Sequence, residues 1–362
     1  MRILFLNSIG SKKWGGGEKW MLMAAKGLQQ KGHFVTIGCS SDSVICKNAL
    51  AKSLPVVSLS FNSDIDVYGF IRLLCVIKTH KIDLIVCGQN KDTKIAAFAG
   101  KLSGKVTVIA RHGLQLISKK LKYRYIFSKM IHGIITNSAT IKQEYDTYGW
   151  FPNDFVKVIH NGFTPPKEVV DIDIREEYNL DLDQHIIFSA GRLASQKGYE
   201  ILLEVAKEAK QSKNKWVFVI AGKGKLQSKL NQTVKREGLE KVVFFKGFVK
   251  DVLPYIKSSD IFVLPSYYEG MPNAVMEAMG LGKCCVVTSV NGNNELINDG
   301  QEGLLVDAGN ASALYNAIKR VTDDAVLRDE LGKNASLKIE KMFSEERMID
   351  QLNQFLISKS IE

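Results

Sequence analysis

Two glutamates stand eight positions apart in the stretch YYEGMPNAVMEAMG: Glu269 on a loop that contains glycine and proline, and Glu277 in the helix-forming run that follows. About two helical turns separate them, or roughly 12 Å along the helix axis. That length fits a nucleoside diphosphate-sugar laid along the helix, with ribose hydroxyls at Glu277, phosphate at the amides in between and a hexose at Glu269. The alternative interpretation is a capping glutamate followed by an ordinary helix-surface glutamate.

Two cations occur in a second glycine-bounded stretch, GRLASQKG, which follows an apolar run and opens a helical one. Arg192 and Lys197 lie five positions apart, so both can converge near the helix start, where the helix dipole also favours an anion. A diphosphate suits this combination, and two solvated cations on an exposed turn are the alternative. The next turn, AGKGKL, lacks the third glycine of a dinucleotide fingerprint, so we expect no NAD cofactor.

Near the N-terminus, SKKWGGGEKW places Gly15, Gly16 and Gly17 ahead of a helical pattern. Such glycines let the backbone approach a ligand and direct amide N–H groups at it, although a tight turn also uses glycine. The stretch ARHGLQ places His112 after an apolar strand and beside Gly113. A histidine there could hydrogen-bond or polarise a transferring sugar, or it could serve a structural role.

At 362 residues, with 45% hydrophobic and 24% charged residues, the chain is long enough for two globular domains. No run approaches the roughly 20 apolar residues of a membrane-spanning helix, and the N-terminal run lacks a signal-peptide cleavage site. The six cysteines form no C-x-x-C pair, which predicts reduced thiols in a cytoplasm. The net charge of +11 permits a phosphorylated ligand, an anionic lipid or nucleic acid, but no nucleic-acid-binding signature accompanies it.

Three D-x-D sequences could in principle hold a metal ion against a diphosphate. They are Asp64 with Asp66, Asp171 with Asp173, and Asp181 with Asp183. One lies in a loop outside the glycine-rich series and two lie in an acidic linker. We therefore interpret all three as solvated surface, and we expect neither a metal nor another cofactor.

Short apolar runs alternate with amphipathic helical patterns along the whole chain. The runs ILFLNS, FVTIGC, LIVCG and VTVIAR are typical of buried strands, and EKWMLMAAKGLQQKG of a helix with one apolar face. After the acidic linker at 164–184 the order resumes, with strands at HIIFSAG, WVFVIAGKG, VVFFKGF, IFVLPS and CCVVTS. This alternation predicts two Rossmann-like α/β domains facing a central cleft, at 1–163 and 164–344, with a C-terminal helix at about 345–362 that packs back on the first.

A series of motifs extends over nearly the whole chain, in the order GGGEKW with KGHFV, HNGF, GRLASQKG, AGKGKL, GFV, EGMPNAVMEAMGLGK and NDGQEGLLV. Together they resemble the GT-B fold retaining glycosyltransferases of family 4. The E-x7-E motif from Glu269 to Glu277 is the most specific of these elements. The segment VNGNNELI departs from the paired glycines and proline usual before Glu295, and GKCCVV lacks the usual proline before its strand. The first departure lies near the sugar end of the donor, so it leaves the donor open.

The resemblance implies a role for each matched residue. Arg192 and Lys197 would neutralise the donor diphosphate without a metal, Glu277 would hold the ribose, and Glu269 would hold the donor sugar. Glu269 and His112 would be the catalytic residues, with His112 beside the transferring carbon. The other donor-binding residues would be Met271, Asn273 and Ala274, through their backbone, and Gly16 and Gly17 of the first domain.

The implied activity is transfer of a sugar, with retention, from a nucleotide diphosphate-sugar to a glycan or lipid-linked acceptor in bacterial surface polysaccharide or lipopolysaccharide synthesis. A non-catalytic nucleotide-sugar-binding partner subunit and a sugar-nucleotide epimerase of the same architecture are the alternatives. In the acceptor domain, LISKKLKYRYIFSKMIHG mixes basic and aromatic residues, which suits either an anionic membrane surface or a solvated helix. We therefore expect a cytoplasmic protein, peripheral on the inner face of the plasma membrane if this segment binds lipid.

Overall fold

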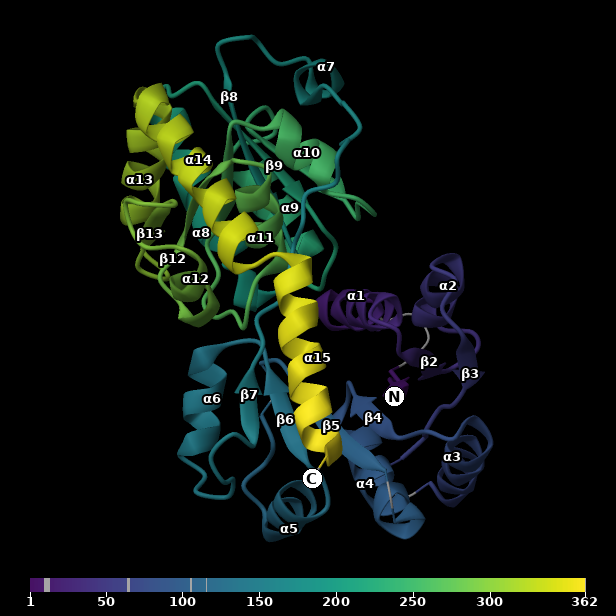
Figure 1. Ribbon diagram of the computed structural model, residues 1–362. Coiled ribbons are helices and arrows are strands. Elements are labelled where there is room, and N and C mark those ends of the chain that lie inside the picture. Colours follow the sequence, from purple (N-terminus) through teal and green to yellow (C-terminus); the bar gives the residue numbers. More distant parts are fainter. Residues whose placement is uncertain (10–13, 64–65, 105, 115, 362) are drawn as a thin grey trace. The chain divides into compact units, whose positions relative to one another are not determined.

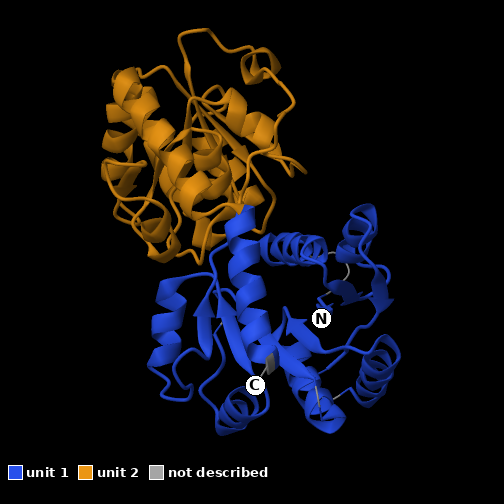
Figure 2. Ribbon diagram, in the orientation of Figure 1, with its two compact units in different colours: residues 1–162, 345–362 blue, residues 163–344 orange. Residues whose placement is uncertain are grey.

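The computed structural model describes residues 1–9, 14–63, 66–104, 106–114 and 116–361, with only the backbone of residue 361. They form two compact units (Figure 2), each built around a parallel sheet. Unit 1 comprises Met1–Gly162 together with Glu345–Glu362, and unit 2 comprises Phe163–Ser344. The predicted domain boundary, after residue 163, differs by one residue from the boundary between the units.

The described sheet of unit 1 has the strand order β3-β2-β1-β4-β5-β6-β7, with every pair parallel. Its central strands are buried on both faces, which is why their sequences are continuously apolar. The order reverses between β1 and β4, and in such sheets ligands bind beyond the carboxyl ends of the strands at this switch point. The strands are β1 Arg2–Leu6, β2 Phe34–Cys39, β3 Val56–Ser58, β4 Leu84–Cys87, β5 Thr107–His112, β6 Gly133–Thr136 and β7 Val156–Val158.

Helices cover both faces of this sheet (Figure 1). On β1, Ile3 and Phe5 pack against α1, α2 and α15, whereas Leu4 and Leu6 pack in the core formed with α3, α4, α5 and α6. The C-terminal helix α15 therefore belongs to the core of the N-terminal half of the chain. The helices are α1 Gly16–Gln30, α2 Val44–Ala51, α3 Val67–His80, α4 Asn90–Ser103, α5 Leu121–Lys129, α6 Ala139–Asp146 and α15 Glu345–Ile361.

Unit 2 repeats the architecture, with the described strands in the order β10-β9-β8-β11-β12-β13 and the switch point between β8 and β11. One face packs against α8, α9 and α13 and the other against α7, α10, α11 and α12, while α14 contributes to both cores. The strands are β8 His185–Ala190, β9 Trp216–Ala221, β10 Val243–Gly247, β11 Ile261–Leu264, β12 Cys284–Thr288 and β13 Leu304–Val306. The helices are α7 Ile174–Tyr178, α8 Tyr199–Gln211, α9 Gln227–Arg236, α10 Leu253–Ser258, α11 Asn273–Gly280, α12 Asn291–Leu296, α13 Ala311–Asp323 and α14 Ala325–Met342.

The prediction of two Rossmann-like α/β domains with parallel sheets is confirmed. The acidic segment 164–184, interpreted from sequence as a linker within the predicted second domain, is part of unit 2. It contains the short helix α7, whose Ile174 is fully buried, and the backbone N–H of Ile174 donates to Ser258 Oγ at 3.2 Å. Arg175 of the same helix forms an ion pair with Asp260, which precedes β11.

Candidate active site

The switch point of unit 2 brings together motifs that are about 70 positions apart in the sequence. The loop after β8 carries Arg192 and Lys197, and the loop after β11 carries Glu269. Because β8 and β11 are hydrogen-bonded neighbours and run parallel, their carboxyl ends meet at one edge of the sheet. The two predicted donor motifs therefore leave the sheet side by side.

Lys197 and Glu269 form an ion pair at this edge. Lys197 Nζ lies 2.5 Å from Glu269 Oε1, and their side chains are only 17% and 6% exposed. Ser266 Oγ donates to the same carboxylate oxygen at 2.6 Å, and Thr288 Oγ1, at the end of β12, donates to the Ser266 carbonyl at 2.5 Å. The sequence analysis predicted Lys197 and Glu269 but missed Ser266 and Thr288, which fix the carboxylate in place.

The two loops are also joined through their backbones. Tyr267 N donates to the Gln196 carbonyl and Gln196 Nε2 donates to the Tyr268 carbonyl, both at 2.8 Å. Gly198, which follows this contact, has φ +63°, and a Cβ atom on it would collide with the Pro265 carbonyl. A glycine is therefore required where the GRLASQKG loop passes the β11 loop.

The other predicted donor-binding residues of unit 2 lie around this pair. Arg192 is exposed on the same loop as Lys197. The rest follow Glu269 along the chain: Met271 is buried, Asn273 and Ala274 form the first turn of α11, and Glu277 is half-buried in its second turn. Backbone N–H groups in a first helical turn do not take part in the helix's own hydrogen bonds. This is the position that the sequence predicts for the phosphate-binding amides of Asn273 and Ala274.

The segment VNGNNELI, which departs from the family pattern, contacts the loop of Glu269 directly. Gly292 N, in the first turn of α12, lies 3.4 Å from the Glu269 carbonyl and donates to it. A Cβ atom on Gly292 would collide with the Gly270 carbonyl. One glycine therefore suffices for this close approach, and the neighbouring positions are occupied by Asn291 and Asn293.

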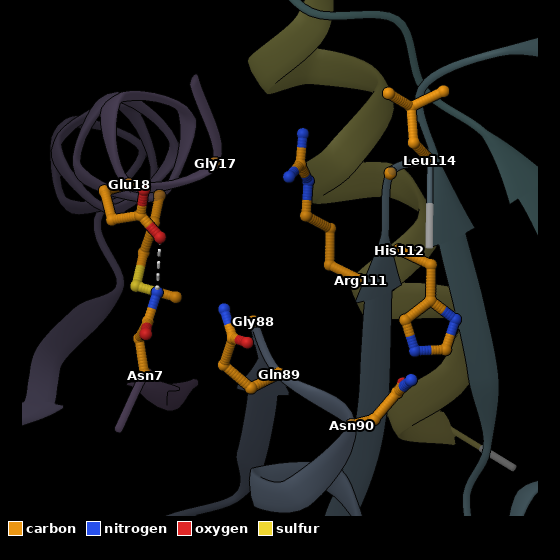
Figure 3. A pocket seen from close by; sticks show the side chains of 11 residues that line it. Asn7, Gly17, Glu18, Gly88, Gln89, Asn90, Arg111, His112 and Leu114 are labelled. Atoms are coloured by element: carbon orange, nitrogen blue, oxygen red, sulfur yellow. Dashed lines mark hydrogen bonds between the residues drawn. The ribbon is translucent and has the colours of Figure 1, made fainter. Parts of the chain in front are cut away.

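A pocket of about 180 Å³ lies at the switch point of unit 1 (Figure 3). Asn7 follows β1, Gln89 and Asn90 follow β4, and Arg111 and His112 end β5. Its volume lies below the roughly 300 Å³ at which pockets for drug-sized ligands begin, so it has the scale of a single sugar unit. The amide, carboxylate and imidazole groups that line it are suited to binding hydroxyl groups.

His112 lines this pocket in a defined protonation state. Ile117 N donates to Tyr145 Oη at 3.3 Å, and we infer that the Tyr145 hydroxyl donates its own hydrogen to His112 Nδ1, 2.8 Å away. That bond leaves the proton of the neutral ring on Nε2. Burial, assisted by the nearby Arg111 charge, lowers the pKa of His112 to about 3, so the ring is neutral at physiological pH. His112 is therefore equipped to donate from Nε2 and not to act as a proton acceptor at that atom.

His112 Nε2 is a buried donor, and Asn90 Oδ1 is a buried acceptor of the same pocket. Neither atom has a hydrogen-bond partner among the described residues. Since buried polar atoms are normally paired, this arrangement favours a ligand or water that supplies the missing bonds.

Three further polar residues of the pocket were missed by the sequence analysis. The Arg111 guanidinium stacks 4.4 Å above the Trp20 ring and donates to Asn161 Oδ1 at 3.2 Å. Burial lowers the pKa of Arg111 to about 10, partly offset by Glu18, so it keeps its charge at neutral pH. Glu18 is buried and accepts from Asn7 Nδ2 at 3.3 Å (Figure 3). The sequence signal that could have indicated Arg111 and Asn7 as pocket residues is their position at the ends of apolar strand patterns.

Gly16 and Gly17 form the first turn of α1 and do not precede it. The first bond of this helix runs from Lys19 N to the Gly15 carbonyl at 3.1 Å, so the N–H groups of both glycines lie ahead of the hydrogen-bond ladder. A Cβ atom on Gly17 would lie 3.4 Å from Arg111 Nη1. The helix start and the guanidinium are therefore adjacent, and both favour an anion. Residues 11–13 of the same motif lie outside the described residues.

Four of the described aspartates in the D-x-D sequences cap helices or form surface ion pairs. Asp66 and Asp173 cap the N-termini of α3 and α7, and Asp171 and Asp183 pair with Lys257 and Lys215 on the surface. Asp64 lies outside the described residues. Across the part of the chain that the structure describes, no group of three or more histidine, cysteine, aspartate or glutamate side chains could hold a metal ion. Of the described helices, none is both long and apolar enough to cross a membrane.

Comparison with known proteins relates each unit to a protein family. Residues 14–165 match the family model "Glycosyltransferase Family 4", and residues 170–338 match "Glycosyl transferases group 1". The chain is 29% identical over 308 residues to the Escherichia coli UDP-Gal:alpha-D-GlcNAc-diphosphoundecaprenol alpha-1,3-galactosyltransferase, which covers 81% of this chain and 79% of the relative. It is also 29% identical over 227 residues to the lipopolysaccharide core biosynthesis glycosyltransferase LpsE of Rhizobium meliloti, covering 62% of this chain and 64% of the relative.

Among solved structures, Anabaena HepE in complex with UDP and glucose superposes with a TM-score of 0.85. The sequence identity is 22%, and the match covers 99% of this chain and 100% of HepE. At that identity the comparison shows the fold. The first unit thus matches the Glycosyltransferase Family 4 model and the second the Glycosyl transferases group 1 model, and the chain has the fold of two Rossmann-like domains seen in GT-B structures.

Proposed function

We propose that this protein transfers a sugar, with retention, from a nucleotide diphosphate-sugar to a glycan or lipid-linked acceptor in bacterial surface polysaccharide or lipopolysaccharide synthesis. The two matched domains and the names of the relatives support sugar transfer in such pathways. Unit 2 supplies most of the donor-binding residues, and unit 1 supplies the acceptor-binding surface. The donor is a UDP-sugar, since one relative is named for UDP-Gal and the structural neighbour binds UDP.

The observation that carries this proposal is the shielded Lys197–Glu269 ion pair at the switch point of unit 2. In the unliganded site Lys197 satisfies the carboxylate. When a diphosphate binds, the ammonium can turn to the phosphate oxygens, joined by the exposed Arg192 from the same loop. Glu269, still held by Ser266, is then available to accept hydrogen bonds from the donor sugar.

The chemistry is departure of a nucleoside diphosphate as the bond from the sugar to the phosphate oxygen breaks. The acceptor hydroxyl oxygen forms the new bond on the same face of the sugar, and the departing diphosphate takes the hydroxyl proton. Negative charge grows on the leaving phosphate, and cations already in position stabilise it more in the transition state than in the ground state. Lys197, Arg192 and the amides of Asn273 and Ala274 supply that stabilisation, with Glu277 holding the ribose. A metal ion is not required in this scheme, because two side-chain cations serve the diphosphate.

In unit 1, His112 binds a hydroxyl of the transferring sugar through its Nε2–H, and Gly16 and Gly17 bind phosphate through their amides. The tautomer of His112 supports the first role, and the nearness of Arg111 to the start of α1 supports the second. His112 then acts by hydrogen bonding and not by proton transfer, since its lowered pKa makes it a poor base.

The test is turnover of UDP-sugars with and without a lipid-linked glycan acceptor, with the anomeric configuration of the product read by NMR. We expect release of UDP that depends on the acceptor and a product with the configuration of the donor. A non-catalytic subunit would release nothing, an epimerase would convert the donor without an acceptor, and inversion would contradict the retaining mechanism. The Lys207→Ala variant is a suitable reference, because Lys207 of α8 pairs with Glu237 at the C-terminal end of α9, away from the loops that carry Arg192, Lys197 and Glu269.

A further inference from the structure

Helices α4 and α5 of unit 1 expose apolar side chains on neighbouring surfaces. Phe98 and Leu102 lie one turn apart on α4, and Leu121 and Tyr125 lie one turn apart on α5. All four are at least half exposed, with Leu121 at 81%. We call these residues, together with the exposed Lys101 and Lys122, the α4–α5 surface.

The two helices are connected through aromatic and cationic side chains. Lys101 Nζ of α4 lies 5.9 Å from the centre of the Tyr125 ring, and Lys94 Nζ lies 5.1 Å from the Tyr123 ring. Lys122 Nζ also lies 5.1 Å from the Tyr123 ring. These contacts make one continuous surface out of two helices that are separate in the sequence, and Figure 1 shows them beside each other at one end of unit 1.

Charge on this surface has a single sign. Between residues 116 and 129 the sequence has five lysines and arginines and neither aspartate nor glutamate. Helix α4 adds the exposed Lys101, and its sole acidic residue, Asp92, is fully buried and accepts from Ser8. The chain as a whole has 49 basic and 38 acidic residues. The separation of basic from acidic residues is therefore a feature of this surface and not of the whole chain.

We propose that the α4–α5 surface binds the headgroup region of an anionic phospholipid membrane. Exposed leucine and phenylalanine insert among the acyl chains, tyrosine lies at the interface, and lysine ammonium groups contact lipid phosphates. The basic charge identifies the partner, because an anionic membrane offers both a negative potential and an apolar interior. A second copy of the same surface would bring like charges together.

This inference goes beyond the proposed reaction and does not depend on it. The test measures co-sedimentation of the full chain with lipid vesicles, without donor or acceptor. One set of vesicles contains phosphatidylcholine alone, and the other contains phosphatidylcholine mixed with phosphatidylglycerol. We expect binding to the anionic vesicles that weakens with added salt, and little binding to the neutral ones. Equal binding to both vesicle types, or none to either, would overturn the proposal whatever the enzymatic activity.

The charge contribution is tested by replacing Lys101, Lys120 and Lys122 with glutamine. Each lysine near an anionic membrane contributes about fivefold to binding, so the triple variant should bind roughly 100-fold more weakly. The matched control replaces three exposed lysines of unit 2, Lys235, Lys333 and Lys341, with glutamine, which changes the net charge equally. An equal loss in both variants would mean that total charge and not this surface decides binding.

The apolar contribution is tested with Leu121→Ser, and its control is Leu182→Ser, since Leu182 is 91% exposed in unit 2. We expect a several-fold weaker partition into anionic vesicles for the first variant and no change for the second. A dimer in sedimentation velocity that is lost in Leu121→Ser would overturn the proposal in favour of contact between copies of the chain. Equal competition for the surface by RNA and by anionic vesicles would show general anion binding and would also overturn it.

Discussion

Lys197 and Glu269 depend on each other in the unliganded protein. Glu269 is buried, and a buried carboxylate without a partner is costly, so the ion pair and the Ser266 hydrogen bond compensate for the lost hydration. The same contact restrains the Lys197 ammonium at the edge where a diphosphate would arrive. Sequence spacing indicated both residues but not their contact, because they lie 72 positions apart.

The Lys197→Ala variant separates donor binding from local structure. A UDP-sugar at 100 times its dissociation constant should stabilise the unaltered protein by about 2.7 kcal/mol in a thermal-shift measurement. The variant should lose this shift, because the remaining cation, Arg192, cannot replace the bond from the ammonium. It should also be less stable without ligand, by about 3 kcal/mol, since Glu269 is left buried without its cation.

Two further variants make this prediction specific. Lys207→Ala breaks an ion pair on α8 at the surface and should keep the full donor shift. Adding Glu269→Gln to Lys197→Ala removes the uncompensated charge and should restore part of the lost stability without restoring the shift. A normal donor shift in Lys197→Ala would place the diphosphate elsewhere.

His112 gives the protein a stability that depends on pH. Its pKa is lowered from 6.5 to about 3 in the folded chain, chiefly by burial. Between these values the unfolded chain binds a proton that the folded chain does not, so the contribution of the neutral ring is complete above pH 6.5 and declines as the pH falls towards 3. At about pH 5 the loss should be about 2 kcal/mol.

The measurement is the unfolding midpoint as a function of pH for the unaltered chain, His112→Gln and Tyr145→Phe. His112→Gln should show a shallower decline below pH 6.5, because glutamine takes up no proton. Tyr145→Phe leaves the ring buried and should keep the steep decline, while nitrogen NMR of the ring should show loss of the pure Nε2–H tautomer. Identical pH profiles for all three proteins would mean that His112 is not neutral and buried as described.

At the scale of elements, alternation of apolar runs with helical patterns was sufficient to predict the two Rossmann-like domains. The strands that were predicted individually, such as β1, β4 and β11, carry dense apolar runs that are buried, apart from Arg2 at the start of β1. Strands β3 and β13 were not predicted, because each is three residues long and lies at a sheet edge. Helix α7 could not be predicted, because only Ile174 of its five residues is buried and the segment therefore shows no apolar face.

The site could be predicted where its residues have a glycine as neighbour, and not where they lack one. Lys197, Glu269 and His112 stand beside glycines that mark turns after strands. Arg111 and Thr288 belong to strands whose sequences resemble any buried strand. Which strand ends meet depends on the strand order, and local sequence patterns do not encode that order directly.

Gly198 shows what the loop contact requires of the sequence. The Gly198→Ala variant adds a Cβ atom at φ +63° that would collide with the Pro265 carbonyl, so we expect a loss of about 3 kcal/mol or more in the free energy of unfolding. Gly300→Ala is the matched control, because Gly300 of the same unit has φ +71° with nothing near the new atom. It should cost only the left-handed backbone term, about 1 kcal/mol. Thermal unfolding of both variants measures the difference, and equal losses would contradict the proposed contact.

At the scale of the whole molecule, the chain enters unit 2 once and then returns to complete unit 1. Helix α15 packs against α1, where a Cβ atom on Gly27 would meet the Ile349 side chain. His33 Nε2 and Asn353 Oδ1 lie 2.7 Å apart, and Lys31 pairs with Asp350 at 2.6 Å. Unit 1 therefore cannot bury its first face until residues 345–361 have been made, so the two ends of the chain fold as one body.

Leu352 tests this coupling, because it is fully buried between α15 and the sheet of unit 1. Leu352→Ala should cost about 2–5 kcal/mol, through lost burial and the cavity left behind. Amide hydrogen exchange should then accelerate in β1, α1 and β2, more than 300 positions away in the sequence, while β8 and β9 of unit 2 stay protected. The control is Ile357→Ala on the same helix, whose side chain is 40% exposed and whose loss should be much smaller. If exchange accelerated only within α15, the helix would be an appendage to unit 1 and not part of its core.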